Sequence, residues 1–420
     1  MTAAADGGVT PVRPRRSYAA GVRTTGFLFV LAASLAPAAL ALAACAPTPR
    51  IDPDTGGAPA RALGMNDVTV LVPLPVDPAV PVVARIDGDG GDGLVSPELA
   101  ARLLGTDLGP KNGLPVAHDD FHVVAIRFDL CARAVVGRCR DGEDGRLRLV
   151  LQPLYTQAGA VFAHDIALHG FYPIPAAELV AVVAELRALA QLQPADAATA
   201  LAVSPALAAP AGAAAYAARL RTLVMRYARS DNLIRLTVFG QNASSAAFAW
   251  KFRGLDRRGG GFAPLEVPGL AGAPTQAVLL AGGDAIYATE PVADVPAGFV
   301  TAINGAIFGA ASDGERRAAV DALVELQDPT RHDAVDVQCL SCHVATFLTR
   351  RRAEAIGVDP TTIAGRYESS YDLAVDTVAG RDPRVLRGLG WAAGQPAISQ
   401  RVANDTAQVL TEIEARFPPP

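Results

Sequence analysis

The sequence has no excess of positive charge. Its 37 Lys and Arg residues are outnumbered by 42 Asp and Glu residues, and the formal net charge is −5 at pH 7. This balance excludes a basic nucleic-acid binder. Charged residues make up only 19% of the chain and apolar residues 50%, so we expect a globular protein with a sizeable core rather than a disordered chain.

Several common catalytic signatures are also missing. The sequence contains no Gly-x-Ser-x-Gly nucleophile turn, no Gly-rich phosphate loop followed by lysine and no His-Glu-x-x-His motif. Their absence removes the commonest hydrolase, nucleotide-binding and zinc-protease signatures. The functional interpretation therefore depends on the few side chains with distinctive chemistry, above all the five cysteines and six histidines.

Apolar runs long enough to span a bilayer are lacking beyond the N-terminal segment. In that segment, four arginines between residues 13 and 23 precede an apolar run at 27–36, and small residues lead to Leu42-Ala43-Ala44-Cys45. The arrangement is typical of an export signal, and the final tetrapeptide resembles the lipobox of bacterial lipoproteins. The resemblance implies that residues 1–44 are a lipoprotein signal peptide and that Cys45 is lipidated.

Two alternatives remain for this segment, which are an uncleaved membrane anchor and ordinary cleavage that leaves Cys45 free. With the lipobox interpretation, we expect an exported protein of the cell envelope. It would be lipid-anchored to a bacterial membrane and would face the periplasm or the cell surface.

Composition and periodicity divide the remaining chain into three parts. Residues 45–64 lack periodicity and are rich in Pro, Thr, Asp, Gly and Ala, which predicts a flexible tether. Residues 65–325 predict an α+β body whose N-terminal and middle regions are β-rich, with an Ala/Pro-rich stretch at 194–212 that would subdivide it. Residues 326–420 predict a small, mainly helical region. The predicted fold class is α+β.

Individual elements follow from the same patterns. Apolar runs predict strands at 121–128 and 147–154, paired as a hairpin, and at 233–239 and 246–252. Two Val-rich runs cut by prolines, at 68–74 and 80–86, predict edge strands. Helical spacing predicts a helix after Pro175, another at 213–227 and a third ending near Phe417, and Ser312-x-x-Glu315 predicts a capped helix start.

The most specific motif is Cys339-Leu340-Ser341-Cys342-His343, which fits C-x-x-C-H. This pattern is the attachment signature of c-type haem, because one turn of chain presents two thiols to the porphyrin vinyl groups and the next residue to the iron. The segment resembles the c-type cytochromes. The resemblance implies one covalent haem c, thioether bonds at Cys339 and Cys342, and His343 as the proximal iron ligand. Residues 326–420 would then form a cytochrome c-like, haem-binding region.

The resemblance also implies one-electron transfer with a redox protein partner that the sequence does not identify. The chain departs from the common monohaem pattern, however, because no Met or His follows His343. An upstream residue must supply any sixth ligand, and we choose His332, since Asp328-Pro329 should end the preceding helix and let the chain fold back over the porphyrin. An open iron site and ligation by Met225 are the alternatives.

The other candidates receive simpler interpretations. Cys131 and Cys139 are predicted to form a disulfide within one loop. His118, His122, His164 and His169 are assigned surface or structural roles, because neither sequence pair forms a ready local chelate. In an oxidising compartment, Cys339 and Cys342 could instead form a disulfide or a zinc site. Two other functions therefore stay open, which are a surface interaction lipoprotein with a structural Cys-x-x-Cys knot and a haem enzyme or gas sensor with an open distal site.

Overall fold

The computed structural model describes residues 61–88, 93–109, 116–130, 144–194, 199–209, 212–241, 248–281, 286–332 and 337–419. The predicted signal peptide, the lipidation site Cys45 and the predicted disulfide partners Cys131 and Cys139 lie outside these residues, so those expectations stay predictions. Leu63, at the end of the predicted tether, is only 4% exposed and belongs to the core. Residues 57–420 form one compact unit, and the boundary predicted at 325/326 lies within it.

The centre of the described chain is a ten-stranded antiparallel sheet in the order β1-β2-β3-β5-β6-β7-β9-β10, with β4 paired to β3 and β8 to β7. Its strands are β1 (Thr69–Leu71), β2 (Phe121–Leu130), β3 (Gly145–Gln157), β4 (Ala160–Ala163), β5 (Ile166–Ile174), β6 (Arg235–Gln241), β7 (Phe248–Arg258), β8 (Gly261–Leu265), β9 (Thr275–Ala281) and β10 (Ile286–Glu290). A separate hairpin joins β11 (Leu389–Ala392) to β12 (Gln395–Ile398).

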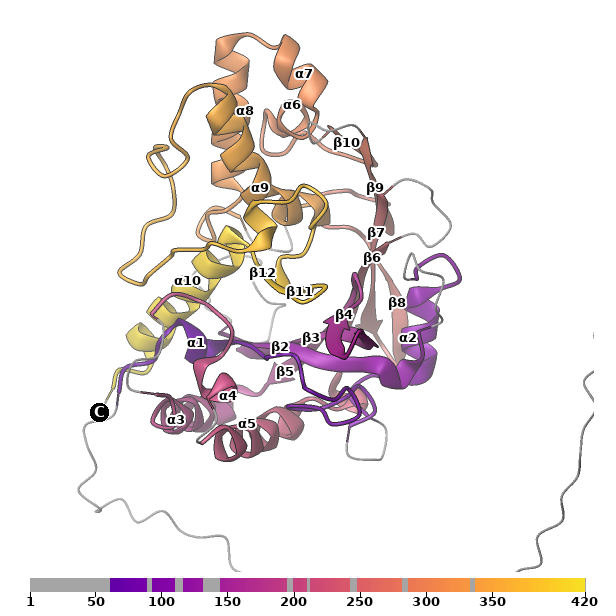
Figure 1. Cartoon of the computed structure of the whole chain (residues 1–420), viewed down its shortest axis with the longest axis vertical. Helices are drawn as coiled ribbons and strands as arrows, with labels where there is room; N and C mark the ends of the chain where they lie inside the picture. The colour runs from indigo at the N-terminus through magenta and orange to yellow at the C-terminus, as the bar shows by residue number, and fades with distance from the viewer. Residues whose placement is uncertain are drawn as a thin grey trace, which may run out of the picture. The chain divides into compact units, whose positions relative to one another are not determined.

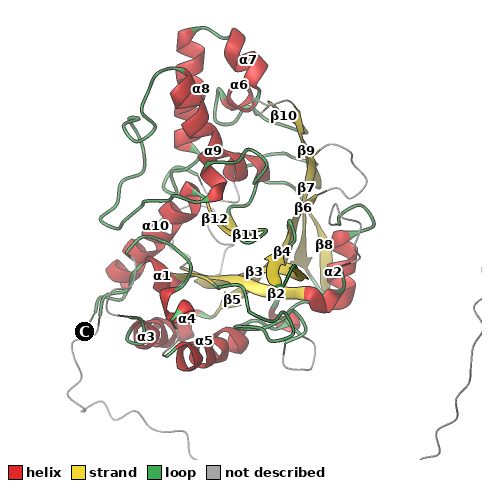
Figure 2. Ribbon diagram, in the orientation of Figure 1, coloured by secondary structure: helices red, strands yellow, loops and turns green. Residues whose placement is uncertain are grey.

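Ten α-helices surround the sheet in the described part. They are α1 (Met65–Val68), α2 (Pro97–Leu104), α3 (Leu179–Ala190), α4 (Pro205–Ala208), α5 (Ala213–Tyr227), α6 (Phe299–Ile303), α7 (Gly305–Ala310), α8 (Asp313–Glu325), α9 (Cys339–Ala355) and α10 (Gln400–Arg416). Short 3₁₀ turns are η1 (His118–Asp120), η2 (Ala176–Glu178), η3 (Ser230–Asn232) and η4 (Val378–Gly380). Figure 2 shows the strands enclosed by these helices. The predicted α+β class is confirmed.

Most elements predicted from periodicity are confirmed. The runs at 121–128 and 147–154 pair antiparallel as β2 and β3, and the helix predicted at 213–227 is α5. Ser312 caps α8, and Glu315 bonds back to the Ser312 backbone, so the capping box forms. One strand prediction is wrong, because the run at 80–86 makes only an isolated bridge from Arg85 to His122. Its one proline, Pro81, removes a backbone donor that a ladder needs.

Both faces of the sheet are covered over β2, β3 and β5, and for this reason these strands read as nearly continuous apolar runs, whereas β9 alternates between buried and half-exposed positions. Helices α3 and α5 lie under the β2–β3–β5 part, whereas α9, α10 and the β11–β12 hairpin lie on the opposite side (Figure 1). Two hydrophobic cores result. The first joins β1, β2, β3 and β5 to α1, α3, α5 and α10, and the second joins β7, β9 and β10 to α6, α8 and α9. The C-terminal region therefore contributes to both cores.

Candidate functional site

The Cys-x-x-Cys-His segment forms the first turn of α9. Cys339 and Cys342 are three residues apart and so are neighbours on the helix surface, and neither forms a disulfide with a described residue. The turn is fixed to β9 by two buried amides. Gln276 accepts a hydrogen bond from the Leu340 N–H (3.0 Å) and donates to Gln338 (2.8 Å), and Gln338 in turn donates to the Ala293 carbonyl (2.7 Å). The position of both thiols is thus set by contacts with the sheet.

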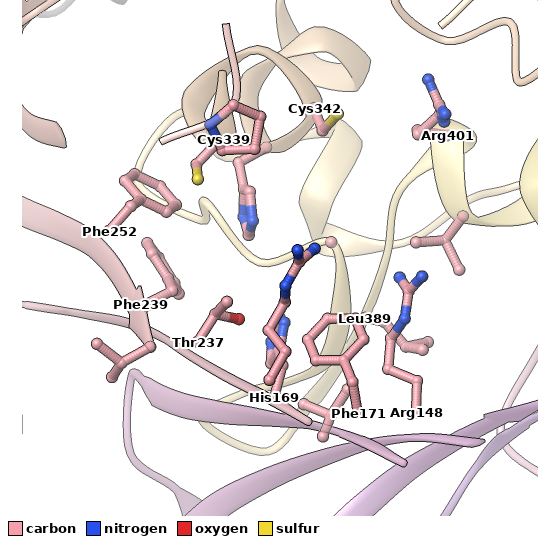
Figure 3. A pocket seen from close by; sticks show the side chains of 18 of the residues that line it. Arg148, His169, Phe171, Thr237, Phe239, Phe252, Cys339, Cys342, Leu389 and Arg401 are labelled. Carbon is pink, nitrogen blue, oxygen red and sulfur yellow. The ribbon is translucent and has the colours of Figure 1, made fainter. Parts of the chain in front are cut away.

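A cavity of about 190 Å³ lies between this turn and the sheet, and the thiols and His343 all line it. We call the lining residues of β3, β5, β6 and β7 the sheet wall, which consists of Arg146, Arg148, Val150, His169, Phe171, Arg235, Thr237, Val238, Phe239, Phe252, Arg253 and Gly254. The opposite side, the C-terminal wall, consists of Val337, Cys339, Cys342, His343, Leu389, Ser399, Arg401 and Val402. Figure 3 shows the two walls facing one another, with His169 and Phe171 rising from the strands toward the cysteine-bearing turn.

Strand register explains why such different residues share the sheet wall. His169 pairs with Val150 on β3 and with Thr237 on β6, and Thr237 pairs with Gly254 on β7. Neighbouring positions in the ladder point to the same face, and so do residues two apart along each strand. His169 therefore lies in one row of side chains that crosses the sheet wall from strand to strand. Phe171 lies in the next row.

His343 has its imidazole over two aromatic rings of the sheet wall. The ring centroid lies 5.1 Å from that of Phe239 and 4.9 Å from that of Phe252. The Nδ1 atom bonds the Leu386 carbonyl, and since a carbonyl only accepts, Nδ1 carries the proton. Burial lowers the pKa of His343 to about 4, so the ring is neutral and its Nε2 lone pair is available for a metal.

The Cys339 thiol is unreactive in this environment. Burial, followed by the nearby Cys342, raises the pKa of Cys339 to about 12. A thiol rather than a thiolate is therefore present at neutral pH, and it is a poor nucleophile toward disulfides or metals.

Positive charge concentrates on one side of the cavity. Six arginines and one aspartate, Asp405, line it within the described part of the chain. The guanidinium groups of Arg146, Arg148 and Arg235 lie 5.5, 5.1 and 5.9 Å from the Phe171 ring centroid. Asp129 pairs with Arg148 (2.9 Å), and Asp256 pairs with Arg235 (2.7 Å).

Arg387 adds a buried cation beside the cavity. Its side chain is 1% exposed and pairs with Asp165 at 2.8 Å. Its Nε and Nη1 atoms have no hydrogen-bond partner among the described residues, and neither does Nε of Arg148. Of these two arginines only Arg148 lines the cavity. Because a buried donor without an acceptor is costly, its Nε is suited to an anionic group that enters there.

Three of the predicted site residues thus meet at one place, namely Cys339, Cys342 and His343. His332 does not line the cavity, and its Nε2 bonds Glu325 Oε1 at 2.9 Å instead. Met225 also lies elsewhere and packs against the first core. The sequence offered no local signal for His169, because its role depends on strand pairing with residues far away in the chain.

The remaining histidines have structural contacts, as the sequence analysis expected. His118 bonds the Val95 carbonyl (2.9 Å), His164 stacks on Tyr155 (4.2 Å between centroids) and His122 is 4% exposed. Among the described residues, no three His, Cys, Asp or Glu side chains converge in a way that could hold a bare metal ion. The helices described here include none with the length and apolar character needed to cross a bilayer.

Comparison with protein-family models, with curated proteins and with solved structures gives no match. The chemistry of the site is therefore argued from its residues. It combines two thiols, a neutral imidazole, two aromatic rings and a cationic side, an arrangement that suits a flat apolar group with anionic substituents.

Proposed function

We propose that this protein is a c-type cytochrome-like electron carrier with one haem, bound covalently through Cys339 and Cys342 and ligated by His343. The observation that carries the proposal is that both thiols and the imidazole, which the motif singles out, line one cavity. A structural Cys-x-x-Cys knot would not need a cavity beside it, nor arginines on the facing strands.

The other residues of the cavity fit the same group. A haem has an apolar macrocycle and two carboxylates, and the cavity lining provides aromatic rings at Phe239 and Phe252 and cations at Arg148 and Arg235. The unpartnered Nε of Arg148 would gain an acceptor from a propionate. When bound, the haem supplies reversible one-electron chemistry.

The protein residues have their own tasks in this proposal. The Leu386 carbonyl fixes the tautomer and orientation of His343, so that Nε2 faces the iron. Phe239 and Phe252 exclude water from that imidazole. Gln276 and Gln338 hold the first turn of α9 in place, which keeps Cys339 at the cavity.

The setting proposed for this carrier is the cell envelope, with Cys45 as its lipid attachment point. Haem attachment outside the cytoplasm agrees with export, and the acidic chain is expected to exchange electrons with a redox protein rather than to bind nucleic acid. Comparing palmitate-analogue labelling of the wild type with Cys45→Ala tests the anchor, and equal labelling of both would reject it.

The haem itself is tested by expressing the full chain with a haem-attachment system. After extraction with acidic acetone, the wild type should retain haem in a pyridine haemochrome assay, whereas Cys339→Ala with Cys342→Ala should retain none. The haem should also titrate as a single one-electron couple. Complete loss of haem from the wild type on extraction would reject the proposal and leave the surface interaction lipoprotein as the better interpretation.

A further inference from the structure

We infer that His169, on strand β5, is the second protein ligand of the haem iron and completes a bis-histidine site with His343. The inference rests on the function proposed above. It assigns the sixth coordination position to the sheet, far from the attachment motif in sequence.

The position of His169 in the sheet wall supports this assignment. Its neighbour two residues earlier on the strand, Ala167, pairs with Phe239 across the ladder, so His169 and Phe239 are diagonal neighbours. Side chains in that relation have Cα atoms about 7–8 Å apart. Because the His343 ring lies 5.1 Å from Phe239, the two imidazoles face the same part of the cavity from opposite walls.

The His169 imidazole is also available for coordination. Among the described residues, no hydrogen bond or ion pair engages its ring, although it lies in an aromatic and cationic environment. The side chain is half-buried and lines the cavity, so one of its ring nitrogens is free to bind a metal there. Of the described side chains that line the cavity, only His169 adds a nitrogen or sulfur donor suited to iron beyond those of the motif itself.

The alternative ligands are held elsewhere. The imidazole of His332 bonds Glu325, and its backbone N–H bonds the Asp328 carbonyl at 3.1 Å. Its own carbonyl accepts a hydrogen bond from Arg401 at 2.5 Å. Ligation by His332 would require these contacts to break, whereas His169 already lines the cavity.

Coordination by two histidines has spectroscopic consequences. The iron would be six-coordinate and low-spin, and its potential would lie below that of a His/Met site. No position would be open to a small ligand, so the site would suit electron transfer better than gas sensing or oxygen chemistry.

The test uses the full haem-loaded chain in four forms: wild type, His169→Ala, His169→Met and the control His332→Ala. Each is first checked for covalent haem and for folding by circular dichroism. Spin state is then read from the absorption and electron paramagnetic resonance spectra, and carbon monoxide binding from stopped-flow mixing. We expect the wild type and His332→Ala to be low-spin and slow to bind. His169→Ala should be high-spin, bind carbon monoxide at least tenfold faster and return to low-spin with added imidazole.

His169→Met keeps the inference testable if the alanine variant does not fold, since it should remain six-coordinate but with a higher potential. A high-spin wild type would overturn the assignment. So would a low-spin His169→Ala together with an unchanged potential in His169→Met. Neither outcome would count against the covalent haem itself. A high-spin His332→Ala would overturn it in favour of His332. If the wild type carries no covalent haem, both this inference and the proposed function fail.

Discussion

The two walls of the cavity are built in different ways. The C-terminal wall takes its chemically distinctive residues from five consecutive positions, 339–343, whereas the sheet wall draws on β3, β5, β6 and β7, which are spread over more than a hundred residues. The first is a local motif on one helical turn, and the second exists only after strands have paired. One wall of a cofactor-binding site can therefore be recognised from a sequence motif, whereas the other depends on which strands pair in the fold.

The two walls also differ in charge. The C-terminal wall presents thiols, a neutral imidazole and one arginine, Arg401, whereas the sheet wall presents several guanidinium groups. Aspartates on neighbouring strands pair with Arg148 and Arg235, and Asp107, which follows α2, pairs with Arg253. If the haem proposal is right, the C-terminal wall fixes the cofactor and the sheet wall adjusts its electrostatics. Substitutions on each side should then have separable effects.

The largest loss in the free energy of unfolding is expected from replacing Asp165, which connects the start of β5 to Arg387 near the C-terminal wall. Asp165, just before β5, pairs with the buried Arg387 at 2.8 Å and also accepts hydrogen bonds from Trp250 (3.2 Å) and Gln241 (3.0 Å). Asp165→Asn would leave the Arg387 charge buried and unpaired. We expect a loss of about 3–5 kcal/mol in the free energy of unfolding, measured by urea denaturation.

The matched control is Asp231→Asn, which removes an exposed partner of Arg229 in a pair where both side chains are more than 60% exposed. It should cost less than about 1 kcal/mol. Equal losses in the two variants would mean that the Asp165 link does not hold the walls together.

A smaller loss in the free energy of unfolding is expected from replacing Gln276, which packs behind the C-terminal wall. Gln276 is 0% exposed and connects the Leu340 N–H, Gln338 and the Pro291 carbonyl. Gln276→Leu would leave buried polar groups unpaired, at a cost of about 2–3 kcal/mol. Because the first turn of α9 would lose its attachment, the yield of covalent haem should also fall.

Urea denaturation and a pyridine haemochrome assay measure these two quantities, with the exposed Gln191→Leu as the control, expected within about 0.5 kcal/mol of wild type. A normal haem yield in a destabilised Gln276→Leu would show that the turn is positioned without this amide.

The fold was predictable from sequence where the signal is local. The helix at 213–227, the capping box at Ser312 and the β2–β3 pair all follow from spacing within one segment, and so does the grouping of Cys339, Cys342 and His343. The sheet wall could not be predicted, because no short stretch of sequence shows that Val150, His169 and Thr237 lie side by side on neighbouring strands. The prediction of His332 relied on nearness in sequence, and the hydrogen bond to Glu325 shows that nearness in sequence does not place a side chain at a site.

The C-terminal region shows the same limit. Its helices were expected as a small separate part, but α10 packs against α1 and β2 and α9 packs against α8 and the sheet. The β11–β12 hairpin between them was not anticipated. Short strands of four residues give too few alternations for a periodic signal.

The charge of the sheet wall should appear in the redox potential. Arg148→Gln removes a cation that lines the cavity, and the oxidised haem should be stabilised relative to the reduced form, so the potential falls. For a unit charge about 10 Å away in an effective dielectric of about 20, the effect is on the order of 1 kcal/mol, or tens of millivolts. Potentiometric titration measures it. Arg229→Gln, also a substitution of an aspartate-paired arginine but outside the cavity lining, should leave the potential unchanged, and an equal fall in both would mean that the cavity arginines have no special effect.

The smallest effect on the redox potential is expected from Asp107, which pairs with Arg253 of the sheet wall. Its replacement should raise the potential, whereas Arg148→Gln should lower it. Asp107 accepts hydrogen bonds from Lys251 (2.6 Å) and Arg253 (2.8 Å). Burial alone would raise the pKa of Asp107, but the two cations outweigh it and hold the pKa below its ordinary value. Asp107→Asn leaves Arg253, which lines the cavity, without its counter-charge, so the haem potential should rise. The rise should be smaller than the fall caused by Arg148→Gln, because Asp107 is 31% exposed and solvent screens its charge.

The same aspartate gives a pH signature in stability. Because its folded pKa is depressed, its contribution is fully present above the unfolded value of about 4 and is lost as the pH falls through the lower folded value. The difference in unfolding free energy between wild type and Asp107→Asn should stay below about 1 kcal/mol from pH 7 to 5 and shrink below pH 4. Urea denaturation across this range measures it. A difference that grows in acid would mean that the wild-type carboxylate opposes folding, and that Arg253 is held by the backbone of α2 rather than by charge.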